Sequence, residues 1–308
     1  MIMKKTIYAG TYTKRLSRGI YRFTFDEGRL GDCELLCETI NPKYLARYKD
    51  KLVAVTDFEK GSGVILLDER GKILDSLQFE EETSCYVTVK DDTVYTANYH
   101  EGTFSVLKIE NERFSLVKKT LIKEKGGCHQ VLLYKDKIMV PCLFLDRIMI
   151  YDHELNKTGE ITFPAGSGPR HGVFSRDGKY LYLVSELSNE LFKINMDTLK
   201  IEKSIPVLEN GETHVKGTAA IRMSDDGKHL YVSTRFKNVL SVIDTDRFEL
   251  IEVKDCGGDH PRDFILVDDF LLCGNMNSDN VVVYDIKKGT LSPIVSELKV
   301  PEAISLCL

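Results

Sequence analysis

Residues 168–186 read GPRHGVFSRDGKYLYLVSE, and residues 217–235 repeat the same pattern as GTAAIRMSDDGKHLYVSTR. Each stretch predicts a short strand, a turn at an Asp-Gly pair, and a second strand rich in aromatic and aliphatic residues. An Asp-Gly pair between two apolar runs favours a hairpin, because such a turn needs a positive φ, which glycine adopts readily. A third strand is expected after each stretch, at 191–195 and at 240–244. The rest of the fold prediction follows from this repeat.

The pattern recurs along the whole chain at a regular interval. Its marker is the residue equivalent to Pro169, and the seven markers are Pro42, Cys85, His129, Pro169, Thr218, Pro261 and Pro301. Successive markers lie 40 to 49 residues apart, which is the length of one four-stranded blade of a β-propeller. Further third strands are expected at 63–67, 104–108 and 281–285. Seven markers therefore predict an all-β fold, a seven-bladed β-propeller.

The two ends of the chain are predicted to share one blade. Pro301 is followed by a single strand at 303–308, while three strand candidates at 6–11, 19–25 and 34–39 precede the first marker. One strand and three strands complete a blade. The C-terminal strand is therefore expected to pair with the N-terminal strands and to close the ring, which removes free sheet edges. A β-sandwich would need fewer strands and would leave this division of the ends unexplained.

The composition is that of an ordinary globular domain. No linker or low-complexity segment divides the chain, so residues 1–308 are expected to form a single domain. The formal net charge is -5 and there is no basic run, which argues against nucleic acid as a partner. No stretch approaches the roughly 20 apolar residues that span a bilayer, and no N-terminal targeting signal is recognised, so no membrane partner is expected. A monomer or a weak homo-oligomer is expected.

Several kinds of chemistry lack a motif in this chain. The eight cysteines are scattered, and no His or second Cys pair completes a zinc set. We therefore expect reduced thiols and a cytoplasmic protein. No spacing of His, Asp or Glu indicates a metal site, and neither a Gly-x-Ser-x-Gly elbow nor a phosphate-cradling Gly-x-x-x-x-Gly-Lys sequence occurs. No metal and no cofactor are expected.

Polar signatures recur near the starts and ends of strands in most blades. They are Ala9-Gly10-Thr11-Tyr12-Thr13, Cys128-His129-Gln130-Val131, Gly168-Pro169-Arg170-His171, Ser185-Glu186-Leu187-Ser188-Asn189, Ser233-Thr234-Arg235 and His260-Pro261-Arg262-Asp263-Phe264. In this order and spacing they resemble the lactonase family of seven-bladed propellers, which includes 6-phosphogluconolactonase and carboxymuconate cyclase-type enzymes. WD40 propellers are disfavoured, because the chain contains no Trp and so no Trp-Asp dipeptide.

The resemblance implies a catalytic set of four residues: His129, Arg170, Glu186 and Arg235. The repeat places His129 and Arg170 at the starts of inner strands, which line the central channel of a propeller. Glu186 and Arg235 fall near the ends of second strands, a step outside the channel. Further substrate contacts are expected from the same positions in other blades and from their neighbours, namely Gln130, His171, His260, Arg262, Asn98 and Asn275.

These residue types suit the hydrolysis of a lactone. That reaction needs a base to deprotonate water and positive charge to stabilise the oxyanion. Glu186 or His129 is the candidate base. Arg170 and Arg235 are candidates for holding the oxyanion and an anionic carboxylate or phosphate through forked hydrogen bonds. The expected substrate is a small anionic lactone or sugar acid, such as 6-phosphogluconolactone.

Two other functions stay open at this point. A carboxymuconate-type lactonising enzyme would use a similar basic pocket for proton transfer by general acid–base chemistry. A non-catalytic propeller would bind a partner on its rim, since fold alone does not fix function. For Glu186 and Arg235 themselves, the alternative is a structural ion pair between neighbouring blades.

Overall fold

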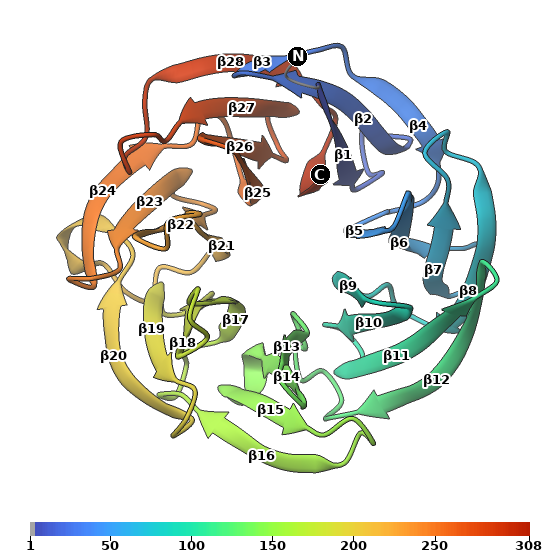
Figure 1. Cartoon of the computed structure of the whole chain (residues 1–308), viewed down its shortest axis with the longest axis horizontal. Coiled ribbons are helices and arrows are strands. Elements are labelled where there is room, and N and C mark those ends of the chain that lie inside the picture. Colours follow the sequence, from blue (N-terminus) through green and yellow to red (C-terminus); the bar gives the residue numbers. More distant parts are fainter. Residues whose placement is uncertain (1–3) are drawn as a thin grey trace.

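The computed structural model describes residues 4–308 as a ring of seven antiparallel sheets around a central channel (Figure 1). Blade 1 contains β29 (Ala303–Cys307), β1 (Lys5–Thr11), β2 (Gly19–Asp26) and β4 (Glu34–Glu38), with the short β3 (Arg29–Leu30) also paired to β2. Blade 2 contains β5 (Leu45–Tyr48), β6 (Lys51–Asp57), β7 (Ser62–Leu67) and β8 (Ile73–Glu80). Blade 3 contains β9 (Tyr86–Lys90), β10 (Thr93–Asn98), β11 (Thr103–Glu110) and β12 (Arg113–Leu121).

The remaining four blades follow the same order, from the innermost to the outermost strand (Figure 1). Blade 4 contains β13 (Leu132–Tyr134), β14 (Lys137–Cys142), β15 (Arg147–Tyr151) and β16 (Lys157–Thr162). Blade 5 contains β17 (Pro169–Phe174), β18 (Tyr180–Ser185), β19 (Glu190–Asn195) and β20 (Lys200–Pro206). Blade 6 contains β21 (Thr218–Met223), β22 (His229–Thr234), β23 (Val239–Asp244) and β24 (Glu249–Asp255). Blade 7 contains β25 (Pro261–Val267), β26 (Phe270–Asn275), β27 (Asn280–Asp285) and β28 (Ile294–Lys299).

The predicted seven-bladed β-propeller is confirmed, and its local signals are present in the structure. The third strands expected at 63–67, 104–108 and 281–285 are β7, β11 and β27. Both Asp-Gly turns join the first and second strands of a blade, with Gly178 at φ 71° and Gly227 at φ 74°. In each turn the glycine N–H donates to a serine carbonyl three residues earlier, at 2.9 Å and 3.0 Å.

The ring is closed as predicted, by the antiparallel pairing of β29 with β1. Tyr8 lies opposite Cys307 and Ala9 opposite Leu306. On its other edge β1 pairs with β2, so the strand from the C-terminal end of the chain becomes the innermost strand of blade 1 (Figure 1). Neither edge of β1 is left free.

Glu302, in the turn before β29, fixes the loop that follows β1. Its buried carboxylate accepts hydrogen bonds from the backbone N–H groups of residues 14–17, at 2.8–3.2 Å. Its carbonyl oxygen accepts a further bond from the Tyr12 N–H at 3.3 Å. Burial acts to raise the pKa of Glu302, but these backbone hydrogen bonds outweigh it and lower the pKa. The segment before the last strand therefore holds the loop that carries Tyr12.

The apolar core lies between the blades. Neighbouring blades cover both faces of each sheet, so inner and middle strands are largely buried, and all residues of β7 and β10 are buried. The outer strand β12 is mostly exposed. Tyr231 of blade 6 packs in one cluster with Phe264 and Tyr284 of blade 7. This arrangement explains why the second and third strands are near-continuous apolar runs in the sequence.

The helical segments described are two single turns, η1 (Leu143–Leu145) and η2 (Glu209–Gly211). Within residues 4–308 neither these nor any other helix has the length and apolar character required to cross a membrane. All eight cysteines are free thiols. Cys128 and Cys142 lie opposite each other with their sulfur atoms 3.7 Å apart.

Replacing Leu306 with Ala tests the closure of the ring. Leu306 is 5% exposed and belongs to the cluster between blades 1 and 7, so L306A should lower the free energy of unfolding by about 2–5 kcal/mol. Leu308 is 47% exposed and serves as the matched control, with an expected change within about 0.5 kcal/mol. Urea unfolding measures both. Equal midpoints for the two variants would mean that β29 does not contribute to the core.

Candidate active site

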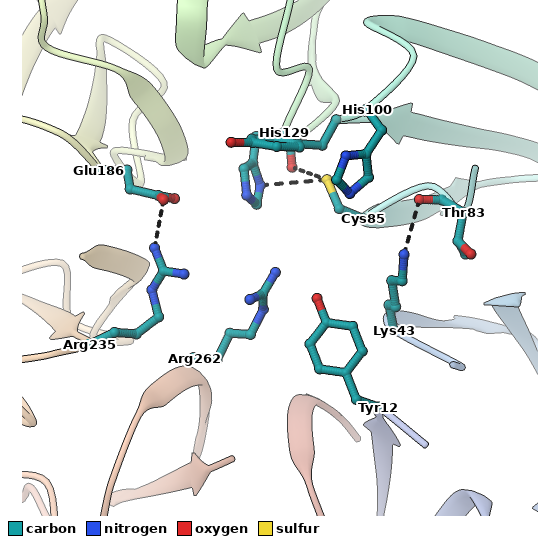
Figure 2. Close-up of a pocket in the computed structure, with 10 residues that line it drawn as sticks. Tyr12, Lys43, Thr83, Cys85, His100, His129, Glu186, Arg235 and Arg262 are labelled. Carbon is teal, nitrogen blue, oxygen red and sulfur yellow. Dashed lines mark hydrogen bonds and ion pairs between the residues drawn. The ribbon is translucent and has the colours of Figure 1, made fainter. Parts of the chain in front are cut away.

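A cavity of about 220 Å³ opens at one end of the central channel, and all seven blades contribute to its wall. In chain order its lining residues are Tyr12, Lys43, Thr83, Cys85, Tyr99, His100, His129, Glu186, Arg235 and Arg262. Figure 2 shows their side chains converging on one space. The structure thus brings together four of the residues singled out in the sequence: His129, Glu186, Arg235 and Arg262.

The Glu186 carboxylate is held between two arginines. Its Oε2 accepts a hydrogen bond from Arg170 Nε at 2.8 Å, and its Oε1 lies 2.8 Å from Arg235 Nη2. Burial acts to raise the pKa of Glu186, but the charges of Arg235 and Arg170 outweigh it and lower the pKa from 4.5 to about 2. Glu186 is therefore a carboxylate at neutral pH and a poor proton acceptor.

Both arginines are also anchored to the backbone. Arg170 Nη1 donates to the carbonyl oxygen of Ala219, and Arg235 Nε donates to that of Gly217 at 3.1 Å. Arg170 is 2% exposed, and burial lowers its pKa to about 10, which still leaves it protonated at neutral pH. Arg235 lines the cavity directly, whereas Arg170 lies beneath it. The ion pair between Glu186 and Arg235 joins blade 5 to blade 6, as the structural interpretation of these two residues expected.

His129 is a buried, neutral histidine on the cavity wall. Its ring points into the cavity (Figure 2), and Nδ1 lies 3.7 Å from the Cys85 sulfur. Burial lowers the pKa of His129 well below 6.5, and the nearby charge of Arg170 lowers it further. The Cys85 thiol is also neutral, because burial raises its pKa to about 11. At neutral pH the imidazole of His129 is therefore uncharged, with one unprotonated ring nitrogen.

His171 lies deeper in the channel. It lines a small inner cavity of about 10 Å³ with Arg170 and His129. Its ring meets the His129 ring at a centroid distance of 5.0 Å, edge to face. Neither ring nitrogen has a hydrogen-bond partner within residues 4–308, and burial lowers the pKa of His171 well below its usual value. The predicted substrate contact thus lies beneath the main cavity.

Asn98 and Asn275 do not line the cavity. Each is the last residue of its second strand, whereas Glu186 and Arg235 come one residue after theirs. Because side chains alternate between the faces of a strand, a shift of one residue turns a side chain away. Asn98 instead donates to the Glu82 carbonyl oxygen at 2.5 Å, and Asn275 to that of Cys256 at 3.1 Å. In blade 3 the residue in the position of Glu186 is Tyr99, which does line the cavity.

Gln130 and His260 also lie outside the cavity lining. The Gln130 amide forms two hydrogen bonds with the backbone of Gly172, which tie blade 4 to blade 5. The His260 ring packs edge to face against Phe236, with the centroids 5.3 Å apart. Both side chains thus contact neighbouring protein groups and do not line the cavity.

The sequence analysis missed several lining residues, of which Lys43 is the most informative. Lys43 directly follows the marker Pro42, as Arg170 follows Pro169 and Arg262 follows Pro261. The repeat position alone would have found it. Within residues 4–308 no group of three or more His, Cys, Asp or Glu side chains is arranged to hold a metal ion.

Sequence comparison now places this architecture in a family. The sequence model described as "Lactonase, 7-bladed beta-propeller" matches residues 6–308. The chain belongs to this lactonase family. The resemblance read from the strand-end motifs is thereby confirmed.

Individual relatives cover nearly the whole chain. The 6-phosphogluconolactonase of Bacillus subtilis is 27% identical, over 96% of this chain and 95% of its own. A protein of solved structure from Lactobacillus plantarum is 32% identical, with a TM-score of 0.91 and 99% of both chains covered. The periplasmic gluconolactonase of Pseudomonas aeruginosa is 22% identical with a TM-score of 0.86, again over 99% of both chains. At this level of identity, the similarity to the P. aeruginosa structure supports the fold assignment alone.

Glu186→Gln tests the buried ion pairs of this lactonase family member. The variant leaves Arg170 and Arg235 without their counter-charge, so the free energy of unfolding should fall by about 3–5 kcal/mol at neutral pH. Glu212→Gln removes an exposed pair with Lys237 and should cost less than about 1 kcal/mol.

The decrease in the free energy of unfolding caused by Glu186→Gln should also depend on pH. The stabilisation by a carboxylate whose pKa falls from 4.5 to about 2 on folding is complete above pH 4.5 and is lost as the pH falls through 2. The stability difference between the wild type and Glu186→Gln should therefore shrink as urea unfolding is repeated from pH 5 downwards. A difference that grows towards acid pH would contradict the assignment.

Proposed function

We propose that this protein hydrolyses a sugar-acid lactone, with 6-phosphogluconolactone as the expected substrate. The observation that carries the proposal is a neutral, buried His129 facing a cavity whose other charged groups are mainly cationic. Membership of the lactonase family supports lactone chemistry, and the B. subtilis relative supports the particular substrate. An excess of positive charge favours an anionic substrate by raising its local concentration.

His129 is the general base in this mechanism. It accepts a proton from a water molecule while the water oxygen attacks the lactone carbonyl carbon. The carbonyl electron pair moves onto the oxygen, and Arg235 stabilises the resulting oxyanion with a charged hydrogen bond. As the intermediate collapses, the bond from the carbonyl carbon to the ring oxygen breaks, and the ring oxygen takes the proton from His129. The product acid then loses its carboxyl proton to solvent.

Glu186 is a positioning residue in this proposal. Its two oxygens are engaged by Arg170 and Arg235, and its low pKa makes it a weak base. By holding Arg235 at the cavity wall it fixes the donor before the reaction begins, which lowers the cost of reorganisation in the transition state. We further propose a cytoplasmic location, because all eight thiols are free.

Purified protein should hydrolyse freshly generated 6-phosphogluconolactone faster than its spontaneous opening, with EDTA present. His129→Ala should lower kcat by about 10²–10⁴-fold, since it removes the general base. His153→Ala changes an exposed histidine outside the cavity and should leave kcat unchanged. Acid release at constant pH measures the rate. Full activity in His129→Ala would show that His129 is not the general base. A wild-type rate no higher than that of spontaneous opening would show that 6-phosphogluconolactone is not the substrate.

The pH dependence of kcat/KM gives a second test of His129. A base is active when deprotonated, so kcat/KM rises with pH up to its pKa and is constant above it. Because the pKa of His129 is held well below 6.5, kcat/KM should be constant through neutral pH and fall only in more acidic solution. A profile that still rises with pH across neutrality would contradict a base with a lowered pKa.

A further inference from the structure

The cationic side chains of the site fall into two groups. Arg170 and Arg235 both contact the Glu186 carboxylate. Lys43 and Arg262 line the main cavity and the inner cavity. Within residues 4–308 neither of them lies within ion-pair distance of a carboxylate. Two positive charges of the cavity are therefore uncompensated by the protein.

These two cations enter the cavity from sides other than those of His129 and Glu186 (Figure 2). In Figure 2 Arg262 and Tyr12 point inward from the side opposite His129, and Lys43 approaches from the side opposite Glu186. The Arg262 guanidinium lies over the Tyr12 ring, 5.4 Å from its centroid. The Tyr12 hydroxyl also points into the cavity. The space between the three side chains thus has two charged donors and one hydroxyl donor around it.

The structure does not need Lys43 to hold its surroundings together. Its ammonium group donates one long hydrogen bond, to the Thr83 carbonyl oxygen at 3.4 Å. The loop at residues 83–84 is already held by the buried Glu80, whose carboxylate accepts bonds from Ser84 Oγ at 2.7 Å and Ser84 N at 3.1 Å. A flexible lysine loses side-chain entropy when it is fixed in a cavity wall. The position of the Lys43 side chain in the cavity wall is best explained by an anion that binds beside it.

We propose that Lys43, Arg262 and Tyr12 form the binding site for the phosphate group of a phosphorylated lactone, and that Lys43 sets the preference for it. A phosphate monoester carries about −1.5 to −2 charges at neutral pH, which matches the two uncompensated cations. Arginine binds two phosphate oxygens through its fork, and lysine supplies a compact point charge. The lactone ring then lies between this phosphate site and His129. This inference rests on the proposed function and adds the residues that recognise the phosphate group.

Substrate preference tests the phosphate site. The wild type should show a higher kcat/KM for 6-phosphogluconolactone than for gluconolactone. In Lys43→Met the ratio of the two kcat/KM values should fall at least about 30-fold, the loss typical of removing one partner of a close charge pair. Lys43→Arg keeps the charge and should retain most of the ratio. Lys60→Met changes an exposed lysine of the same blade and should keep the wild-type ratio.

Binding of inorganic phosphate tests the site without turnover. Titration calorimetry should detect phosphate binding to the wild type, and weaker binding by at least about tenfold to Lys43→Met and Arg262→Met. A thermal melt of each variant shows that it is folded. An unchanged substrate ratio in Lys43→Met, or equal phosphate binding in the wild type and both variants, would overturn the phosphate site.

The two proposals fail in different ways. If phosphate binds through Lys43 and no lactone is hydrolysed, the phosphate site stands and the catalytic proposal falls. If lactones are hydrolysed and the ratio in Lys43→Met equals that of the wild type, the catalytic proposal stands and the phosphate site falls.

Discussion

The antiparallel pairing of β29 with β1 is the constraint on which the other features depend. Without it, blade 1 would lack its innermost strand and would present a free strand edge to the channel. With it, blade 1 packs against blade 7 through a shared apolar cluster, and the row of blades becomes a ring. Because the ring is closed, seven loops that are far apart in the chain face one another at one end of the channel. The cavity is a result of that closure.

The charged side chains around this cavity differ in whether they are paired with a carboxylate. Glu186 neutralises part of the charge of Arg170 and Arg235, which allows two arginines to be buried side by side with their donors directed. Burial and the charge of Arg170 together keep His129 neutral. Lys43 and Arg262 line the same cavity and form no ion pair with a carboxylate of the described residues 4–308. The Glu186 carboxylate thus separates the cationic groups of the site into two that are paired with it and two that are not.

The fold could be predicted because every blade meets the same physical requirement. Both faces of each sheet must be buried against the neighbouring blades, so apolar runs recur at a fixed interval. A tight turn must reverse the chain between strands, so Asp-Gly turns recur as well. The repeat could place His129, Glu186, Arg235 and Arg262 near the channel, and the resemblance to the lactonase family singled out His129, Glu186 and Arg235 as catalytic candidates.

Other parts of the site were not identified from the sequence. Asn98 and Asn275 were misplaced because strand alternation makes a single residue decisive, and the repeat fixes the strand ends less finely than that. Lys43 was missed because blade 2 has no polar signature around it. The low pKa of Glu186 depends on distances between blades 5 and 6, which spacing along the chain does not contain.

The Glu302 carboxylate has a consequence for the protein during its synthesis. Blades 2 to 7 contain all of their strands before residues 303–307 leave the ribosome, and chains begin to fold as they emerge. Until Glu302 arrives, the backbone N–H groups of residues 14–17 lack their acceptor, and the loop with Tyr12 is not fixed. A nascent chain can therefore hold His129 and Glu186 on six assembled blades and still lack one wall of the cavity. The cavity wall is therefore completed only by the segment that carries Glu302, so a chain terminated before residue 302 would lack the fixed Tyr12 loop although it contains all the strands of blades 2 to 7.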